Sequence, residues 1–204
     1  MSDNLIHALS SPTDSDTVGA DVTVLHARLV ESASATNSLD LTYRVVDSPV
    51  GRLLLAATEV GLTRIAFESE GHDAVLGSLA TRIGPRILHD DKRFDEIARE
   101  LDDYFDGHRH TFDIPVDLRL SRGFRLEVLR HLRDIPFGRT ESYAQVAASA
   151  GNAKAVRAVG SACATNPIPI VVPCHRVVRS DGGLGGYLGG TAAKRLLLDI
   201  ESAA

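Results

Sequence analysis

The chain has 204 residues, of which 44% are hydrophobic and 24% are charged, and its formal net charge is −5. This profile is typical of a soluble globular protein with one large or two small domains. No stretch approaches the roughly 18 consecutive apolar residues of a membrane span. The two cysteines exclude a disulfide framework and a four-cysteine zinc site.

The N-terminal part is predicted to be an extension followed by an α+β domain. Residues 1–40 are rich in Ser, Thr, Asp and Ala and are expected to be flexible. Residues 41–120 contain short apolar runs between turn residues, which predict an antiparallel meander, and two segments with helical spacing. Gly107 is placed to end the second helix. The expected strands are 43–46, 52–57 and 62–67, and the expected helices are 74–83 and 94–105.

Residues 121–204 are predicted to form a separate, mainly helical domain. A first helix has Phe124, Val128, Leu129 and Leu132 on one face, a second runs from about residue 140 to 148, and a third covers 154–163. The last two are joined by a tight turn that contains Gly151, which is the outline of a helix-turn-helix. Small side chains dominate the third helix, so its backbone can approach a partner closely. The alternative is an ordinary Ala-rich packing helix.

The two parts of the chain differ in charge. Residues 1–120 carry 11 basic and 21 acidic side chains, a balance of −10, whereas residues 121–204 carry 11 and 6, a balance of +5. A polyanion is therefore expected to bind the C-terminal part. The alternative is that charge differs between the domains without a functional consequence.

The segment 166–178 is the most informative one for chemistry. Its apolar run predicts that Cys174 lies at the end of a buried extended segment. Because His175 and Arg176 are cations that can stabilise a thiolate, we expect a lowered pKa for the Cys174 thiol and a nucleophilic role. The alternative is a small core residue, the commonest role of a single cysteine. Contact between Cys174 and His175 requires a bend, since neighbouring side chains of an extended segment diverge.

These residues resemble the O6-alkylguanine-DNA alkyltransferase family, the methylated-DNA–protein-cysteine methyltransferases. The resemblance covers roughly residues 124–201, and residues 42–120 fit only by their strand pattern. It implies a ribonuclease-H-like N-terminal sheet with helices and a C-terminal domain with a winged-helix-like helix-turn-helix. The motifs that carry it are Pro173-Cys174-His175-Arg176-Val177-Val178, Gly185-Gly186-Tyr187-Leu188-Gly189-Gly190, Lys194 through Leu197-Leu198 to Glu201, Ser142-Tyr143, Ala155 to Gly160 and Asn166-Pro167.

The resemblance implies that the Cys174 thiolate removes the alkyl group from O6 of a guanine, irreversibly and once per chain; O4-alkylthymine is a second candidate lesion. His175 takes the thiol proton through water and Glu201 orients the imidazole. Tyr143 donates its hydroxyl to N3 of the guanine, and Asn166 holds the loop and hydrogen-bonds near the thiol. No cofactor and no metal are expected.

The resemblance also implies a base pocket and a DNA surface. The pocket residues are Val177, Tyr187, Leu188 and Pro169; the backbone carbonyls of Cys174 and Val177 accept from the exocyclic amine, and the Leu188 N–H approaches O6. The base is rotated out of double-stranded DNA and Arg157 enters the gap, with the third helix in the minor groove. The DNA-contacting residues are Arg157, Tyr143, Ala155, Val156, Ala158, Gly160 and Ser161.

Two other functions remain open from the sequence. In a lesion sensor or regulator, Cys174 is a signal rather than a catalyst, and in a Cys–His hydrolase Cys174 and His175 supply the nucleophile and the base. For the alkyltransferase function we expect a monomer without an obligate protein partner or a membrane contact. Residues 1–4 do not begin a signal peptide, so we expect a bacterial cytoplasmic location, with access to the nucleoid.

Overall fold

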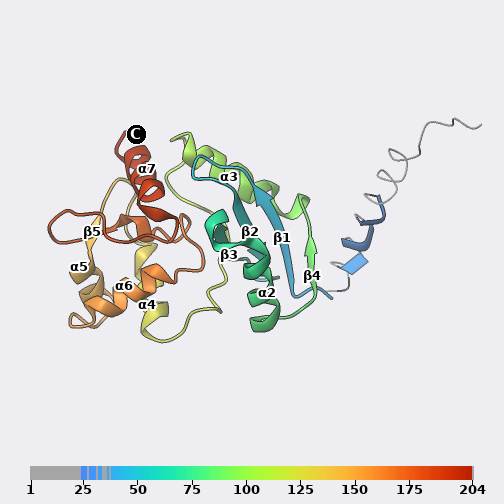
Figure 1. The fold of residues 1–204 in the computed structure, drawn as a ribbon, viewed down its shortest axis with the longest axis horizontal. Coiled ribbons are helices and arrows are strands. Elements are labelled where there is room, and N and C mark those ends of the chain that lie inside the picture. Colours follow the sequence, from blue (N-terminus) through green and yellow to red (C-terminus); the bar gives the residue numbers. More distant parts are fainter. Residues whose placement is uncertain (1–23, 27, 31, 34–35, 37, 204) are drawn as a thin grey trace, which may run out of the picture. The chain divides into compact units, whose positions relative to one another are not determined.

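The computed structural model of the chain describes residues 24–26, 28–30, 32–33, 36 and 38–203 (Figure 1). The predicted extension, residues 1–40, lies for the most part outside these residues. Contacts divide the chain into residues 1–38 and 39–204, and the fold below is that of the second unit. Across the described ranges, each helix is too short or too polar to cross a membrane.

Four strands form one sheet in the order β3-β2-β1-β4. Strands β1 (Leu41–Val46) and β2 (Leu53–Ala57) pair antiparallel as the predicted hairpin, and β3 (Leu62–Phe67) pairs antiparallel with β2 as predicted. The first turn closes where the Gly51 N–H donates to the Ser48 carbonyl at 3.0 Å. The alternation of apolar runs and turn residues was therefore sufficient to locate three of the four strands.

The fourth strand corrects the predicted purely antiparallel sheet. Strand β4 (Ile87–His89) pairs parallel with β1, so the sheet is mixed. A parallel strand requires a crossover, and helix α2 (His72–Arg82), which follows the short 3-10 helix η1 (Glu68–Glu70), lies in that connection. With three residues, β4 is too short to produce a recognisable alternation in the sequence.

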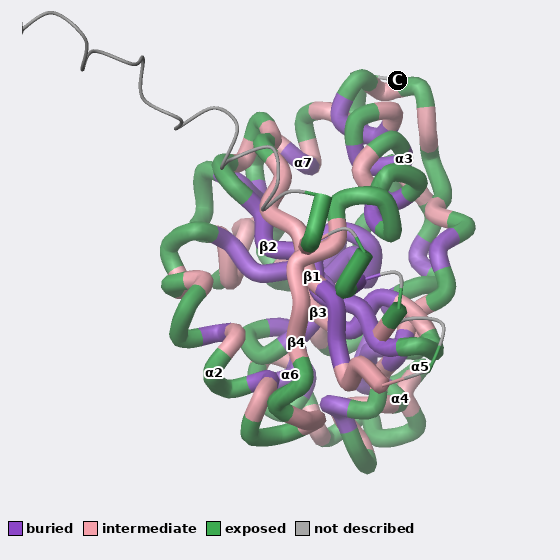
Figure 2. Tube along the Cα trace, turned by 90° about the vertical axis from the view of Figure 1, so that its right-hand side faces the viewer, coloured by how far each residue is buried: buried purple, intermediate pink, exposed green. Residues whose placement is uncertain are grey.

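Both faces of the sheet are covered, and strand β2 is therefore buried along its whole length (Figure 2). Leu54 and Ala56 lie in the smaller core cluster with residues of α2. Leu53 and Leu55 lie in the larger one, with helix α3 (Asp95–Phe105) and the C-terminal part of the chain. Helix α3 follows the 3-10 helix η2 (Lys92–Phe94) and ends before Gly107, whose φ is 75°. One continuous core thus joins α3 to the C-terminal helices.

The C-terminal part contains the predicted helix-turn-helix. Helix α4 (Phe124–Leu132) buries Val128, Leu129 and Leu132, and α5 (Tyr143–Ser149) is followed by a turn and α6 (Val156–Ala164). Helix α6 begins two residues later than predicted, because the Ala155 N–H donates to the Asn152 carbonyl in the preceding turn. Helix α7 (Gly190–Ala203) closes the chain.

A short parallel pair of strands connects the helix-turn-helix to the cysteine segment. Strand β5 (Glu141–Ser142) leads directly into α5, and strand β6 (Val177–Val178) follows the 3-10 helix η3 (Cys174–Arg176). Ser142 caps α5, since its side chain accepts from the Gln145 N–H while the Gln145 side chain accepts from the Ser142 N–H. Tyr143, at the start of α5, is in this way held beside the segment that carries Cys174.

Candidate active site

Cys174 follows a buried and tightly turned segment, residues 166–173. Asn166 organises the turn, because its Oδ1 accepts from the Ile168 N–H at 3.0 Å and its Nδ2 donates to the Val172 carbonyl at 2.8 Å. Ile170 has a φ of 75°, a conformation that is a genuine outlier for a β-branched residue and persists only where the surrounding packing enforces it. The prediction of an extended segment is therefore wrong.

The 3-10 helix η3 bends the chain between Cys174 and His175. Its three residues, Cys174, His175 and Arg176, are all buried. A 3-10 turn directs successive side chains about 120° apart around its axis. The sulfur can thus face one element, the imidazole a second and the guanidinium a third. Three consecutive residues can therefore each contact a different element of the fold.

The expected low pKa of Cys174 is also corrected by the structure. The thiol is 2% exposed, and burial raises its pKa to about 11, although Asn166 and the nearby charge of Lys194 lower it in part. Asn166 Nδ2 lies 3.1 Å from the sulfur. The Arg176 guanidinium, which the sequence suggested as a stabilising cation, is directed instead at Glu201 and at the Ile135 carbonyl. The resting group is therefore a neutral thiol whose proton must be removed during a reaction.

Replacing Asn166 with alanine should destabilise the protein by about 1–3 kcal/mol, because the buried Ile168 N–H loses its partner and the Val172 carbonyl keeps only its bond from the Cys174 N–H. Loss of the Nδ2 donor should also raise the pKa of the Cys174 thiol further. Urea denaturation and a spectroscopic thiol titration in the Cys163→Ala background measure the two effects. Asn152→Ala, at an exposed turn, is the matched control. Unchanged stability and thiol pKa in the Asn166 variant would contradict this description of the turn.

His175 and Glu201 form a buried pair. His175 Nε2 lies 2.8 Å from Glu201 Oε1, and the two side chains are 0% and 1% exposed. Since an ionised carboxylate only accepts, the Nε2 atom carries the proton of this bond. The other ring nitrogen, Nδ1, is then a base, and it is buried without a hydrogen-bond partner in the described part of the chain. Burial lowers the pKa of His175 and outweighs the opposite effect of Glu201, which favours the neutral imidazole.

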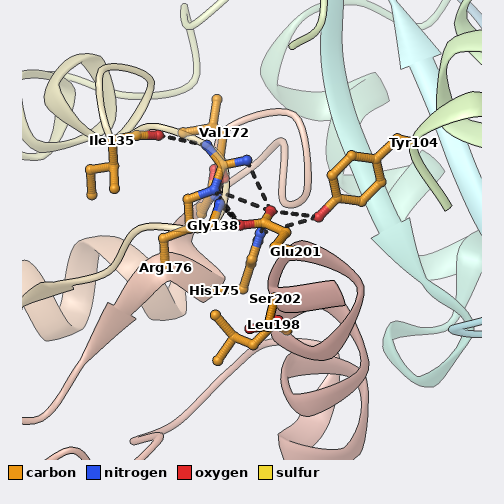
Figure 3. Close-up of polar contacts among 10 residues, drawn as sticks. Tyr104, Ile135, Gly138, Val172, His175, Arg176, Leu198, Glu201 and Ser202 are labelled. Atoms are coloured by element: carbon orange, nitrogen blue, oxygen red, sulfur yellow. Dashed lines mark hydrogen bonds and ion pairs between the residues drawn. The ribbon is translucent and has the colours of Figure 1, made fainter. Parts of the chain in front are cut away.

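Glu201 is the most heavily bonded carboxylate of the site (Figure 3). Arg176 donates to both of its oxygens, from Nε at 2.9 Å to Oε2 and from Nη2 at 2.9 Å to Oε1, and Tyr104 Oη donates to Oε1 at 2.8 Å. The Gly138 N–H donates to Oε2 at 3.1 Å. Burial alone would raise the pKa of Glu201, but the bonds from His175 and Arg176 lower it to about 2. Glu201 is therefore ionised at neutral pH.

Gly138 is a position at which no other residue fits. Its φ is 69°, and a Cβ there would lie 2.9 Å from the backbone oxygen of Glu201. The close approach of the two backbones is what allows the Gly138 N–H to reach the carboxylate. The loop after α4 thereby helps to hold the end of α7.

Three residues of this cluster were not among the predicted site residues: Tyr104, Arg176 and Lys194. Lys194 is 0% exposed, and its Nζ donates to the Val177 carbonyl at 2.6 Å and to the Leu184 carbonyl. Burial lowers the pKa of Lys194, and the nearby thiols act in the opposite direction. Lys194, in α7 after the glycine-rich loop, thus bonds to two carbonyls that precede the loop and connects the chain on its two sides. The motif that contains Lys194 was noted in the sequence, but its spacing did not indicate these contacts.

A cavity of about 430 Å³ opens next to the cluster. It is lined by Tyr143, Gly160, Ala164, Gly186, Tyr187 and Leu188. Four predicted site residues, Tyr143, Gly160, Tyr187 and Leu188, thus share one cavity. Burial and then the nearby sulfurs of Cys163 and Cys174 raise the pKa of Tyr143, so its hydroxyl is a donor at neutral pH.

The glycine-rich loop passes directly against Tyr143. A Cβ on Gly185, which has a φ of 66°, would lie 2.7 Å from the Tyr143 hydroxyl. Two predicted pocket residues, Pro169 and Val177, are buried and are not among the residues that line this cavity. The Val177 carbonyl already accepts from Lys194; a carbonyl has two lone pairs, so one remains for a second donor.

Helix α6 presents the predicted DNA-contacting residues on its outer face. Val159, Ala162 and Cys163 face the core. On the other side, Val156, Arg157, Ala158 and Ser161 are exposed, and Ala155 and Gly160 are half-buried. Because Gly160 also lines the cavity, this face of α6 and the cavity adjoin each other.

Two segments of the chain match described families. Residues 41–118 match the 6-O-methylguanine DNA methyltransferase, ribonuclease-like domain, and residues 123–203 match the 6-O-methylguanine DNA methyltransferase, DNA binding domain. Together these ranges span most of the chain. Their limits separate the sheet and its helices from the helix-turn-helix and α7.

Relatives and solved structures match over a similar length. The methylated-DNA–protein-cysteine methyltransferase of Methanosarcina barkeri is 38% identical over 159 residues, 78% of this chain and 96% of the relative. The O6-methylguanine methyltransferase of Mycobacterium tuberculosis has a TM-score of 0.71 at 37% identity, over 80% of this chain and 93% of that one. The structure of Mycobacterium tuberculosis OGT in complex with DNA has a TM-score of 0.68 at 38% identity, over 79% and 93%.

Proposed function

The chain belongs to the 6-O-methylguanine DNA methyltransferase family, and we propose that Cys174 is the residue that receives the alkyl group. The protein repairs DNA by direct reversal, moving the alkyl group of the lesion onto one of its own cysteines. Cys174 is proposed because it lies next to the buried pair of His175 and Glu201 and because the Asn166 side chain contacts its sulfur. Cys163 is packed in the core from α6.

The proposed lesion is O6-alkylguanine, with O4-alkylthymine as a second candidate. In the reaction, a bond forms between Cys174 Sγ and the alkyl carbon while the bond between that carbon and O6 breaks. The electron pair of the broken bond stays on the guanine, which takes up a proton. Sulfur is a strong, polarisable nucleophile for this displacement. Releasing the alkyl group would need a second nucleophile that attacks the thioether carbon and expels the thiolate, and the proposed reaction supplies none, so each chain acts once.

The thiol proton goes to His175 Nδ1, through a bridging water. Because Nε2 is bonded to Glu201, Nδ1 is the free base of the imidazole, and Glu201 stabilises the imidazolium that forms. Arg176 also faces Glu201 and compensates its charge. The imidazole therefore stays neutral before the reaction and is available as a base at neutral pH.

We propose that the alkylated base enters the cavity beside Tyr143. The Tyr143 hydroxyl is suited to donate to N3 of the guanine, which neutralises charge that develops in the ring as the sulfur attacks. The Cys174 and Val177 carbonyls accept from the exocyclic amine, and the Leu188 N–H faces O6. The bulk of Leu188 at the cavity wall limits the size of the alkyl group.

A base stacked in a duplex is out of reach of a buried thiol, so the nucleotide must rotate out of the helix. The outer face of α6 adjoins the cavity and carries small residues beside one long exposed cation, Arg157. These features support a minor-groove contact in which Arg157 fills the gap left by the rotated base. The protein then acts as a monomer on double-stranded DNA in the cytoplasm, where chromosomal DNA is accessible.

Replacing Arg157 with alanine should slow repair of a lesion in duplex DNA about tenfold or more, because the side chain that replaces the rotated base is lost. Its reaction with free O6-methylguanine base should stay within about twofold of the wild type. The transfer rates of the variant and the wild type are measured in parallel on the duplex lesion and on the free base, and the loss on the duplex is compared with the loss on the free base. Arg99→Ala removes an exposed arginine from α3 and is the matched control for charge. Equal losses on both substrates would argue against a role in base rotation.

The proposed function is tested by incubating the protein with an oligonucleotide that carries O6-methylguanine labelled in its methyl group. Intact-mass and peptide mass spectrometry should find one added methyl group per chain, on Cys174. Turnover beyond one equivalent excludes single use, and tight binding of the lesion without transfer favours a lesion sensor. Formation of an acyl-enzyme with simple esters favours a Cys–His hydrolase.

A further inference from the structure

Helix α3 brings one hydroxyl from the N-terminal part of the chain into the cluster around Glu201 (Figure 3). Tyr104 is 0% exposed. Its Oη donates to Glu201 Oε1 at 2.8 Å and lies 3.3 Å from His175 Nε2. The proposed mechanism otherwise draws its residues from the C-terminal domain, so this contact raises the question of what the hydroxyl contributes.

The position of the hydroxyl is supported by packing of the Tyr104 ring as well as by its own hydrogen bonds. The Tyr104 ring contacts the rings of Phe105, Phe112 and Phe137, with centroids 5.6, 5.2 and 6.1 Å away. Aromatic contacts of this kind fix the ring plane. The hydroxyl is therefore held rigidly against the Glu201–His175 pair by residues that belong mainly to the N-terminal part.

The chemistry of the hydroxyl limits what it can do there. Burial, and then the negative charge of Glu201, raise the pKa of Tyr104 well above its ordinary value, so the group keeps its proton. Its single O–H hydrogen is directed to Glu201, and the oxygen can therefore only accept from His175. An acceptor at Nε2 is compatible with the tautomer that carries its hydrogen on Nε2 and is incompatible with the one that carries it on Nδ1.

We propose that Tyr104 is a positioning residue for alkyl transfer: its hydroxyl, together with Glu201, holds the hydrogen of His175 on Nε2 and leaves Nδ1 free to take the thiol proton. This inference rests on the proposed function and deepens it. It assigns the ribonuclease-like part of the chain a direct role in the active site. The role of that part would otherwise be limited to packing.

Apart from Glu201, the other charged and titratable groups around the imidazole do not supply the same effect. Glu201 and Lys194 face it from α7, Arg176 from η3, and Tyr187 from the glycine-rich loop, with ring centroids 6.3 Å apart. Arg176 and Lys194 are donors that disfavour the imidazolium without choosing a tautomer. Among the described residues, Glu201 and Tyr104 are the ones that accept from the Nε2–H.

The test is Tyr104→Phe, which keeps the ring and its packing and removes the hydroxyl alone. The single-turnover rate of methyl transfer should fall about tenfold at pH 7, the effect of losing a hydrogen bond to a charged group. The acid limb of the rate–pH profile should move to lower pH. The reason is that Nε2 loses an acceptor that stabilises the imidazolium, while Glu201 stays ionised because it keeps its bonds from Arg176 and Gly138.

Tyr43→Phe removes a hydroxyl from β1, outside the cluster, and is the matched control. A Tyr104→Phe rate and pH profile equal to those of the control would overturn the inference. So would a rate that falls equally at all pH values together with the melting temperature, because that is the signature of a purely structural role.

A second readout does not depend on alkyl transfer. Nitrogen chemical shifts of His175 should report the Nε2–H tautomer in the wild type and a mixture of both tautomers in Tyr104→Phe. The Nε2–H tautomer alone in both proteins would overturn the inference. If the wild type transfers no methyl group, the proposed function fails, and the tautomer measurement still decides the role of Tyr104.

Discussion

Replacing Cys174 with alanine should abolish alkyl transfer completely, because the variant lacks the sulfur that forms the new bond to carbon in the proposed reaction. The side chain is small and buried, and its loss leaves a cavity worth about 1–2 kcal/mol. The variant should therefore stay folded and should bind duplex DNA as the wild type does. Transfer of label from the methylated oligonucleotide and a gel-shift titration measure the two properties on the same preparation.

The matched control for Cys174 is the other buried cysteine. Cys163→Ala removes a thiol of similar burial from α6 and should leave transfer intact. If Cys163→Ala also lost transfer, or if Cys174→Ala kept it, Cys163 would have to be considered as the acceptor. A Cys174→Ala variant that no longer binds DNA would indicate instead that the substitution disturbs η3 and the segment beside α6.

Replacing Glu201 with glutamine should reduce both stability and rate. The substitution leaves the Arg176 guanidinium buried without its anion, a change that typically costs about 3–5 kcal/mol. A neutral amide also cannot stabilise the imidazolium, and the transfer rate should fall at least about a hundredfold, the scale of general-base catalysis. Urea denaturation and single-turnover kinetics at pH 7 measure the two effects.

The stability effect of Glu201 should depend on pH with a defined sign. Its pKa is about 2 in the folded chain, against an ordinary value of 4.5, which corresponds to roughly 3 kcal/mol. A lowered carboxyl pKa stabilises the fold fully above about pH 5 and progressively less as the pH falls towards 2. The difference between wild type and Glu201→Gln should therefore shrink through this window, and a difference that is constant from pH 7 to pH 3 would contradict the assignment.

Glu100→Gln provides the control for Glu201. Glu100 is equally buried, at 2% exposure, and it accepts from the Asp113 N–H and pairs with Arg109. Its neutralisation should lower stability without changing the transfer rate of the folded protein. This pair of variants separates the cost of an uncompensated buried charge from the loss of catalysis.

Much of the fold could be predicted from local sequence. Apolar runs between turn residues located β1, β2 and β3, and helical spacing located α2, α3 and the helix-turn-helix within a few residues. These patterns record which side of an element is buried, and burial repeats with the period of the element itself. Strand β4 escaped prediction because three residues are too few to show a period.

The prediction for the cysteine segment shows where sequence neighbours mislead. His175 and Arg176 follow Cys174 directly and suggest a stabilised thiolate. In the folded chain Arg176 is bonded to Glu201, and burial raises the pKa of the thiol. Whether the pKa of the thiol is raised or lowered depends on which elements surround the sulfur. The neighbours of Cys174 in the sequence do not determine those surroundings.

By itself, the sequence determined most strands and helices and indicated the proposed nucleophile with its neighbouring base, since these depend on residue type and short spacing. Only the tertiary structure decided what surrounds them: that Tyr104 reaches Glu201 across 97 positions, that Arg176 donates to the same carboxylate, and that Lys194 in α7 bonds to carbonyls that precede the glycine-rich loop. The physical reason is that contacts between buried polar groups are set by how whole elements pack. Packing joins residues whose separation along the chain follows no period.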